Sequence, residues 1–121
     1  MSLTNTGEDS LLNLFKGSGP HYLALFTVTP SEAGGGTEVS GGAYARQAVT
    51  FGSPSGGTMK NSAEIVFPTA TASWGTVKAW AIFDAASSGS MLWYGDIAVP
   101  KELLAADVYL IEAGGLTLTM D

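Results

Sequence analysis

The sequence predicts an all-β domain, an antiparallel β-sandwich or jelly roll of about seven or eight strands with one short N-terminal helix. Short runs of β-forming residues recur with turn signals every ~8–12 residues, which is typical of sandwiches and jelly rolls. No helical pattern separates these runs, so a parallel sheet of strand–helix–strand units is excluded. We expect residues 1–17 to hold the helix, as part of the same domain or as a docking element, and residues 18–121 to form the sandwich.

The helix is predicted from its capping residues and its apolar face. Residues 4–6 offer cap oxygens, residues 8–9 place negative charge in the first turn, and Gly17 is well placed to end the helix. Four residues supply the apolar face: Leu11, Leu12, Leu14 and Phe15. We expect this face to cover the core, and the alternative is that it docks onto a neighbouring subunit.

The first half of the β-region alternates strands with glycine-rich loops. Residues 21–28 are rich in β-formers and Pro30 closes the run, which predicts a strand. Residues 31–43 contain five glycines and predict a long loop. Residues 44–51 alternate between two faces and predict a second strand, and residues 52–62 predict a second loop.

The second half predicts a central hairpin flanked by shorter strands. Residues 76–84 are apolar on both faces, which favours a central strand. Residues 91–99 are predicted to form its hairpin partner, and residues 100–106 a turn or a short helical turn. Three short strands complete the set: residues 63–67, 107–113 and 115–120.

The charge content predicts a surface that is largely used for contacts with other proteins. Only 13% of the residues are charged, about half of the usual ~25%, and charge is what normally keeps monomers apart. We therefore expect a homo-oligomer, a dimer or a trimer. The net charge of −6 and a single arginine argue against nucleic acid and against an anionic membrane surface as partners.

The sequence predicts no catalytic centre, no cofactor and no metal site. His21 is the only histidine, and it stands at a predicted strand start, where polar residues meet solvent. The acidic residues are dispersed, no serine stands in a nucleophile-elbow context, and the absence of cysteine excludes thiolate zinc sites. The acidic start lacks the basic region of a signal peptide, so we expect synthesis in the cytoplasm.

Two further residues are candidates for a binding role. Arg46 is expected to form a salt bridge with Glu38 or Glu64 that pins the glycine-rich loop, and the alternatives are a ligand-carboxylate clamp or an intersubunit bridge. Trp74 stands at a turn and is the aromatic residue most expected to be exposed, where it could stack on a sugar. Together with residues of the helix, the interface candidates are Leu11, Leu14, Phe15, Glu38, Arg46 and Trp74.

Several blocks of the chain resemble small virion proteins of tailed bacteriophages, of the tail fiber-like kind. The blocks are MSLTN at residues 1–5, YLALFT at 22–27, GGTEVSGG at 35–42 followed by YARQ at 44–47, AEIVFP at 63–68 and GTV at 75–77. The resemblance covers nearly the whole chain in the same order, and the block at 35–47 is the most specific.

The resemblance implies a structural protein of the virion, made in the host cytoplasm, and not an enzyme. Small sandwich or jelly-roll proteins in some tailed phages are capsid decoration or cement proteins, so we expect contacts that bridge subunits of the major capsid protein or of other virion proteins. The alternative is a tail-tip or fibre-associated module that binds a glycan on the host surface. The chain has no fibrous repeat, so it is not a fibre shaft by itself.

Overall fold

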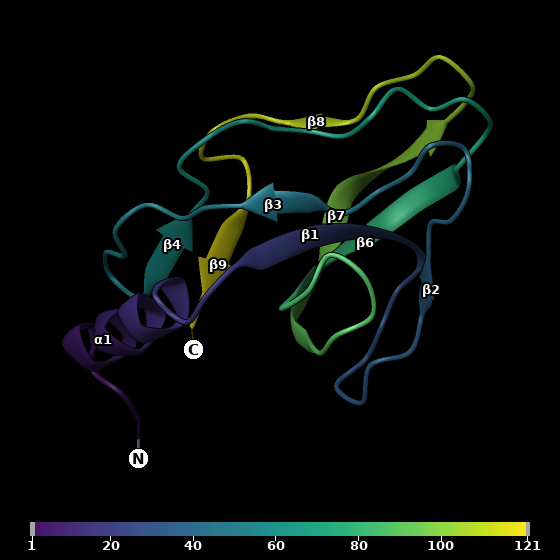
Figure 1. Cartoon of the computed structure of the whole chain (residues 1–121). Helices are drawn as coiled ribbons and strands as arrows, with labels where there is room; N and C mark the ends of the chain where they lie inside the picture. The colour runs from purple at the N-terminus through teal and green to yellow at the C-terminus, as the bar shows by residue number, and fades with distance from the viewer. Residues whose placement is uncertain (1, 121) are drawn as a thin grey trace. The chain divides into compact units, whose positions relative to one another are not determined.

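The computed structural model describes residues 2–120 and consists mostly of strands in antiparallel sheets with one short helix, which confirms the predicted all-β class (Figure 1). Within these residues the chain forms two compact units. Unit 1 contains residues 2–19, 49–65 and 111–120, and unit 2 contains residues 20–48 and 66–110. The chain passes from unit 1 to unit 2 at residues 19–20, and it changes unit again within three short strands: β3 (Gln47–Val49), β5 (Ile65–Val66) and β8 (Leu110–Ile111).

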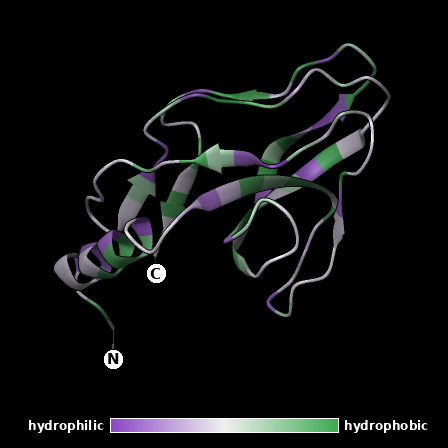
Figure 2. Ribbon diagram, viewed as in Figure 1, coloured by the Kyte–Doolittle hydropathy of each residue, from purple (hydrophilic) through white to green (hydrophobic). Residues whose placement is uncertain are grey.

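Unit 1 begins with helix α1 (Asn5–Lys16), which confirms the predicted helix. The Oγ1 atom of Thr4 accepts a hydrogen bond from Gly7 N at 3.1 Å and so satisfies one of the free N–H groups of the first turn. Gly17 closes the helix with an ordinary right-handed φ of −87° and donates from its N–H to Asn13 O. Hydrophobic and hydrophilic residues both occur along the helix (Figure 2).

The helix contacts β4 (Thr58–Lys60), which pairs with β9 (Thr117–Thr119) in an antiparallel ribbon. Met59 lies opposite Leu118, and both side chains are buried. Leu12 of α1 is also fully buried. β4 lies inside the loop predicted at residues 52–62, because three residues with a partner far along the chain leave no periodic signal.

A buried asparagine ties the end of unit 1 together. The side-chain amide of Asn61 donates to Ala63 O at 2.8 Å and to Glu112 O at 2.9 Å. Its Oδ1 accepts from Leu116 N at 2.9 Å. A buried amide is stable only when its donors and acceptor are bonded, and Asn61 meets this condition by connecting two distant segments.

Unit 2 is built on one antiparallel sheet with the strand order β2-β1-β6-β7, and β3 pairs with β1. The bounds of these strands are β1 (His21–Val28), β2 (Thr37–Glu38), β6 (Gly75–Phe83) and β7 (Met91–Leu103). The predicted central strand is confirmed, because β6 is hydrogen-bonded on both sides. The predicted loop at 31–43 contains the two-residue β2, which is too short to show alternation.

The core of unit 2 combines alanines with phenylalanines on neighbouring strands. Ala24 lies opposite Ala81, and Phe26 lies opposite Ala79. The rings of Phe26 and Phe83 stack with centroids 6.2 Å apart and an interplanar angle of 3°. Small residues on one strand leave room for the rings, so the large and small side chains fill the layer together.

The turn predicted at residues 100–106 begins later than expected, because β7 continues to Leu103 and the turn itself lies at residues 105–106. A proline is tolerated there because β7 is at the edge of the sheet, where no neighbour requires the missing N–H of Pro100. The register with β6 also shifts between Val77 and Ala79. This bulge carries Pro100 out of the regular ladder.

The burial of Leu12 predicts a specific loss of stability. We expect Leu12→Ala to lower the free energy of unfolding by about 2–5 kcal/mol, because it leaves a cavity in unit 1. The matched control is Leu14→Ala on the same helix, since Leu14 is 70% exposed and should change stability by less than ~0.5 kcal/mol. Urea denaturation followed by circular dichroism measures both, and equal losses would contradict the described helix orientation.

Candidate functional site

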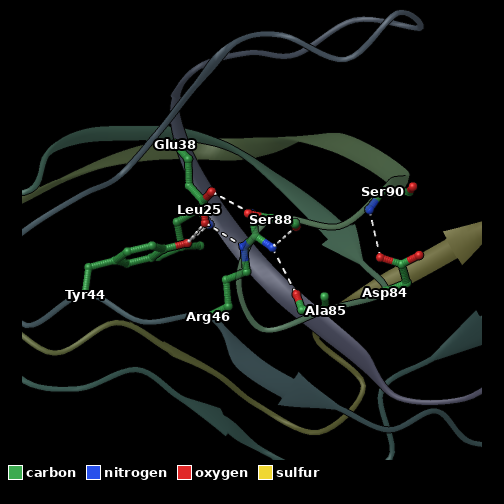
Figure 3. A network of polar contacts seen from close by, with 8 residues as sticks. All are labelled: Leu25, Glu38, Tyr44, Arg46, Asp84, Ala85, Ser88 and Ser90. Atoms are coloured by element: carbon green, nitrogen blue, oxygen red, sulfur yellow. Dashed lines mark hydrogen bonds and ion pairs between the residues drawn. The ribbon is translucent and has the colours of Figure 1, made fainter.

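Arg46 is the central residue of a polar network in unit 2 (Figure 3). Its Nε and Nη2 atoms donate to Oε2 and Oε1 of Glu38, both at 2.9 Å, in the two-point geometry that a guanidinium forms with a carboxylate. Its Nη1 atom donates to Ala85 O at 2.9 Å and to Ser88 O at 2.7 Å. One side chain therefore connects the end of β2 with the loop between β6 and β7.

The Arg46 side chain is largely enclosed, with 8% of its surface exposed, whereas Glu38 retains 25%. The guanidinium carbon lies 3.7 Å from the centre of the Phe83 ring, which makes a cation–π contact. A charged group at this depth is stable only when its donors are bonded and its charge is paired. Arg46 meets both requirements within unit 2.

Tyr44 extends the network to β1. Its hydroxyl donates to Glu38 Oε2 at 2.7 Å and accepts from Leu25 N at 3.0 Å. Its ring packs edge-on against Trp74, with centroids 5.4 Å apart, and lies parallel to the Phe67 ring at 6.2 Å. Tyr44 therefore holds the carboxylate of Glu38 on one side and the aromatic residues of unit 2 on the other.

The network shifts the proton affinities of its members. Burial alone would raise the pKa of Glu38, but the hydrogen bonds from Arg46 and Tyr44 and the charge of Arg46 outweigh it and hold that pKa below its ordinary value. The hydrogen bonds to Glu38 raise the pKa of Arg46. Burial, together with the bond to Glu38, raises the pKa of Tyr44. The pair is therefore ionised, and the phenol is neutral, at neutral pH.

A tight turn at residues 41–43 brings Glu38 and Arg46 together. Gly41, Gly42 and Ala43 all have positive φ angles, which the two glycines adopt without strain and which are uncommon for an alanine. Gly42 is required for a second reason, because a Cβ atom there would lie 2.8 Å from Trp74 Nε1. Trp74 Nε1 donates to Gly42 O at 2.8 Å and so holds the turn in place.

The loop between β6 and β7 is closed at its base and held at its tip. Asp84 Oδ1 accepts from Ser90 N at 2.7 Å, and Asp84 N donates to Ser90 O at 3.2 Å. Ser88 and Gly89 both have positive φ angles, and a Cβ on Gly89 would lie 2.5 Å from Asp84 Oδ1. With Arg46 bound to carbonyls of the same loop, the loop is fixed in one conformation.

The network borders a shallow pocket of about 360 Å³ in unit 2. Its lining is made of small and polar residues: Glu38, Val39, Ser40, Gly41, Tyr44, Ala45, Arg46, Ala86, Ser87 and Ser88. The ionised groups of the lining are bound to each other, and no histidine is among the lining residues. The pocket can therefore offer hydroxyls and backbone groups to a ligand, without an activated nucleophile.

The expectation that His21 meets solvent is wrong. His21 is buried at the start of β1. Burial lowers its pKa, and the charge of Asp84 opposes this shift without reversing it. Within residues 2–120, no group of three or more His, Cys, Asp or Glu side chains is placed to hold a metal ion. In the same part of the chain, no helix has the length and hydrophobicity needed to cross a bilayer.

The predicted salt bridge of Arg46 is confirmed, with Glu38 as its partner. The predicted exposure of Trp74 is wrong, because only 4% of the residue is exposed. A turn beside small residues normally exposes an aromatic ring, but here Tyr44 and the 41–43 turn cover it. Leu11 and Leu14 are exposed on α1, and Phe15 lies beside Phe51 at 6.0 Å within unit 1.

The other members of the network were not predicted from the sequence. Tyr44 stands two residues before Arg46 and therefore shares its face in an extended segment. A contact between the Tyr44 hydroxyl and the carboxylate of Glu38 could have been expected on this ground. The carbonyls of Ala85 and Ser88 gave no signal, because every residue carries the same carbonyl group and only the fold brings these two to Arg46.

The fold and the network define a small all-β protein with an internally clamped polar site in unit 2. A family model described as Podophage GP4 fiber I protein gp80 matches residues 2–119, so the chain belongs to this family. It is a small tailed-phage virion protein of the fiber-like kind, as the resemblance of its sequence implied. No curated protein matches the chain.

The lowered pKa of Glu38 predicts a loss of stability in acid. A carboxyl group with a depressed pKa in the folded state stabilises the fold above its ordinary value of 4.5, and this stabilisation disappears as the pH falls through the folded value. We expect Glu38→Gln to be less stable than the natural chain at pH 7, and the difference to shrink below about pH 4.5 as Glu38 is protonated.

Urea denaturation at several pH values between 3 and 7 measures this difference. The control is Glu64→Gln, because Glu64 is exposed and the structure places Arg46 with Glu38 instead. A constant difference between Glu38→Gln and the natural chain over the whole range would show that the charge of Glu38 does not stabilise unit 2.

Proposed function

We propose that the protein is a non-enzymatic structural module of a podophage fibre. The observation that carries this proposal is the family match, which covers residues 2–119 and whose description is that of a fibre protein. The description supports the fibre alternative of the sequence analysis and gives no support to capsid decoration.

The physical character of the chain fits a module that works through contacts. The chain is short and has no fibrous repeat, so it suits a part attached to a fibre and not the shaft itself. Its charged fraction of 13% is low, and several large apolar side chains are exposed within the described residues. Such a surface favours association with other virion proteins.

A location on the fibre predicts a specific result in electron microscopy. We expect gold-labelled antibodies against the protein to mark the fibres of purified virions and to leave the capsid shell unmarked. Virions that lack the gene should have intact filled heads and fibres with missing density. The fibre proposal would be wrong if the label covered the capsid shell and the fibres of the deletion virions were unchanged. That result would favour capsid decoration.

A second candidate function is contact with a glycan on the host surface through the pocket at Arg46. The supporting observation is that both loops lining the pocket are fixed by Arg46, so its polar groups are already in place before a ligand binds. Preorganised hydrogen-bonding groups reduce the entropic cost of binding. The buried Trp74 is not available for stacking, so this contact depends on hydroxyl and backbone groups.

Filling the pocket predicts a loss of glycan binding. We expect Ser87→Tyr to weaken binding of the protein to host surface polysaccharide at least ten-fold, because the new ring occupies the pocket and leaves the clamp intact. The control is Ser53→Tyr, at an exposed position that does not line the pocket. Biolayer interferometry measures both, and equal binding by the two variants would reject this contact while leaving the fibre proposal in place.

A further inference from the structure

A second hollow in unit 2, the β7 hollow, lies between the turn at residues 31–34 and the start of β7. It measures about 320 Å³, and its lining consists of residues 31–34 and 90–94. Ligand pockets begin at roughly this size, ~300 Å³. The β7 hollow shares no lining residue with the pocket at Arg46, so it is a separate candidate binding site.

The first wall of the β7 hollow is a turn held by its own hydrogen bonds. Ser31 N donates to Gly34 O at 2.9 Å, and Gly34 N donates to Ser31 O at 2.8 Å. The Ser31 hydroxyl donates to the same Gly34 oxygen at 3.1 Å. Just before this turn, Thr29 Oγ1 lies 3.5 Å from Asp96 Oδ1, so the segment after β1 reaches across to β7. Glu32, at the tip of the turn, therefore has a defined position beside the hollow.

The second wall is the start of β7, which is anchored on the core of unit 2. Ser90 N donates to Asp84 Oδ1 at 2.7 Å (Figure 3). Met91 packs against the buried alanines and phenylalanines of the sheet. Two side chains of this wall are exposed, Leu92 at 43% and Tyr94 at 37%. The wall therefore offers an apolar side chain and an aromatic ring on a fixed support.

Two polar groups of the lining have unused hydrogen-bonding capacity. Within residues 2–120, neither the carboxylate of Glu32 nor the hydroxyl of Tyr94 takes part in a hydrogen bond or an ion pair. By contrast, the ionised groups beside the other pocket, Glu38 and Arg46, are bound to each other. The β7 hollow therefore has a carboxylate and a phenol that a ligand can bind.

The charge around the β7 hollow selects a cation. Glu32 is the charged residue of the lining, and no Lys, Arg or His belongs to it. Asp96 adds a second carboxylate, because it lies two residues after Tyr94 and so shares its side of the strand. The chain as a whole carries −6. A cation is attracted by these carboxylates and by the face of an aromatic ring, whereas an anion is repelled by both.

We infer that the β7 hollow receives a lysine side chain of a neighbouring virion protein. The inference rests on the proposed function, in which the protein acts through contacts with other virion proteins. The apolar stem of the lysine lies along Leu92, and its ammonium group lies between Glu32 and the ring of Tyr94. The ammonium group is compact and has three donors, which the Glu32 carboxylate and the Tyr94 hydroxyl can accept.

Titration of the full chain, labelled with ¹⁵N, with N-acetyl-lysine methylamide tests the site by NMR. We expect saturable shifts of the amide signals of residues 31–34 and 90–94, with those of residues 38–46 unchanged. The Nζ-acetylated compound has no charge and should bind roughly five-fold more weakly, since it loses both the ion pair and the cation–π contact. Equal binding of the two compounds would overturn the inference. Tighter binding of glucosamine would also overturn it, because the ligand would then be an amino sugar.

Substitutions in the lining separate local contacts from the general negative charge. Glu32→Gln keeps the size of the side chain and removes its charge, and Tyr94→Leu keeps an apolar side chain and removes the ring. Each should weaken binding of N-acetyl-lysine methylamide about three-fold. The matched control is Glu102→Gln, which removes an exposed carboxylate of β7 outside the hollow and should leave binding unchanged. Equal losses in Glu102→Gln and Glu32→Gln, in spectra that show folded chains, would contradict the inference.

Carbodiimide cross-linking of purified virions tests the source of the lysine. The reagent joins a carboxylate to a lysine amine in direct contact, with loss of water. We expect mass spectrometry to find Glu32 linked to a lysine of a different virion protein. A link to another copy of this chain, or links from Glu102 and none from Glu32, would show that the assignment of the partner is wrong. Neither result changes the immunogold labelling of the fibres, which tests the proposed function separately.

Discussion

The guanidinium of Arg46 is the interaction on which the arrangement of unit 2 depends. It uses four N–H···O contacts to bind a carboxylate on β2 and two carbonyls between β6 and β7, and it covers the ring of Phe83. A lysine could supply the charge but not the planar set of donors. Because the cation is enclosed, each of these bonds is needed to offset its removal from water, and the loops it binds cannot move independently.

Buried polar side chains are hydrogen-bonded in both units of the described chain. Every buried side-chain nitrogen and oxygen in them has a hydrogen-bond partner. In unit 1 this role belongs to Asn61, whose amide binds two separate segments, and in unit 2 it belongs to Glu38, Tyr44 and Arg46.

The sequence predicted the elements with a strong local signal and missed those made by distant partners. The helix, β1 and β6 were predicted because caps, β-formers and an apolar run mark them. The short strands β2 and β4 were placed in loops, because two or three residues show no period and their partners lie elsewhere in the chain. The Glu38–Arg46 bridge was predictable from a single arginine across a glycine turn, whereas the cover over Trp74 depends on tertiary packing.

Pro100 and the bulge beside it determine how wide the sheet of unit 2 can become. A regular outer strand invites another chain to add to it, and continued addition leads to fibrils. A proline and a displaced segment interrupt that template in the second half of β7. The second half of β7 therefore offers no regular edge to which another strand could add.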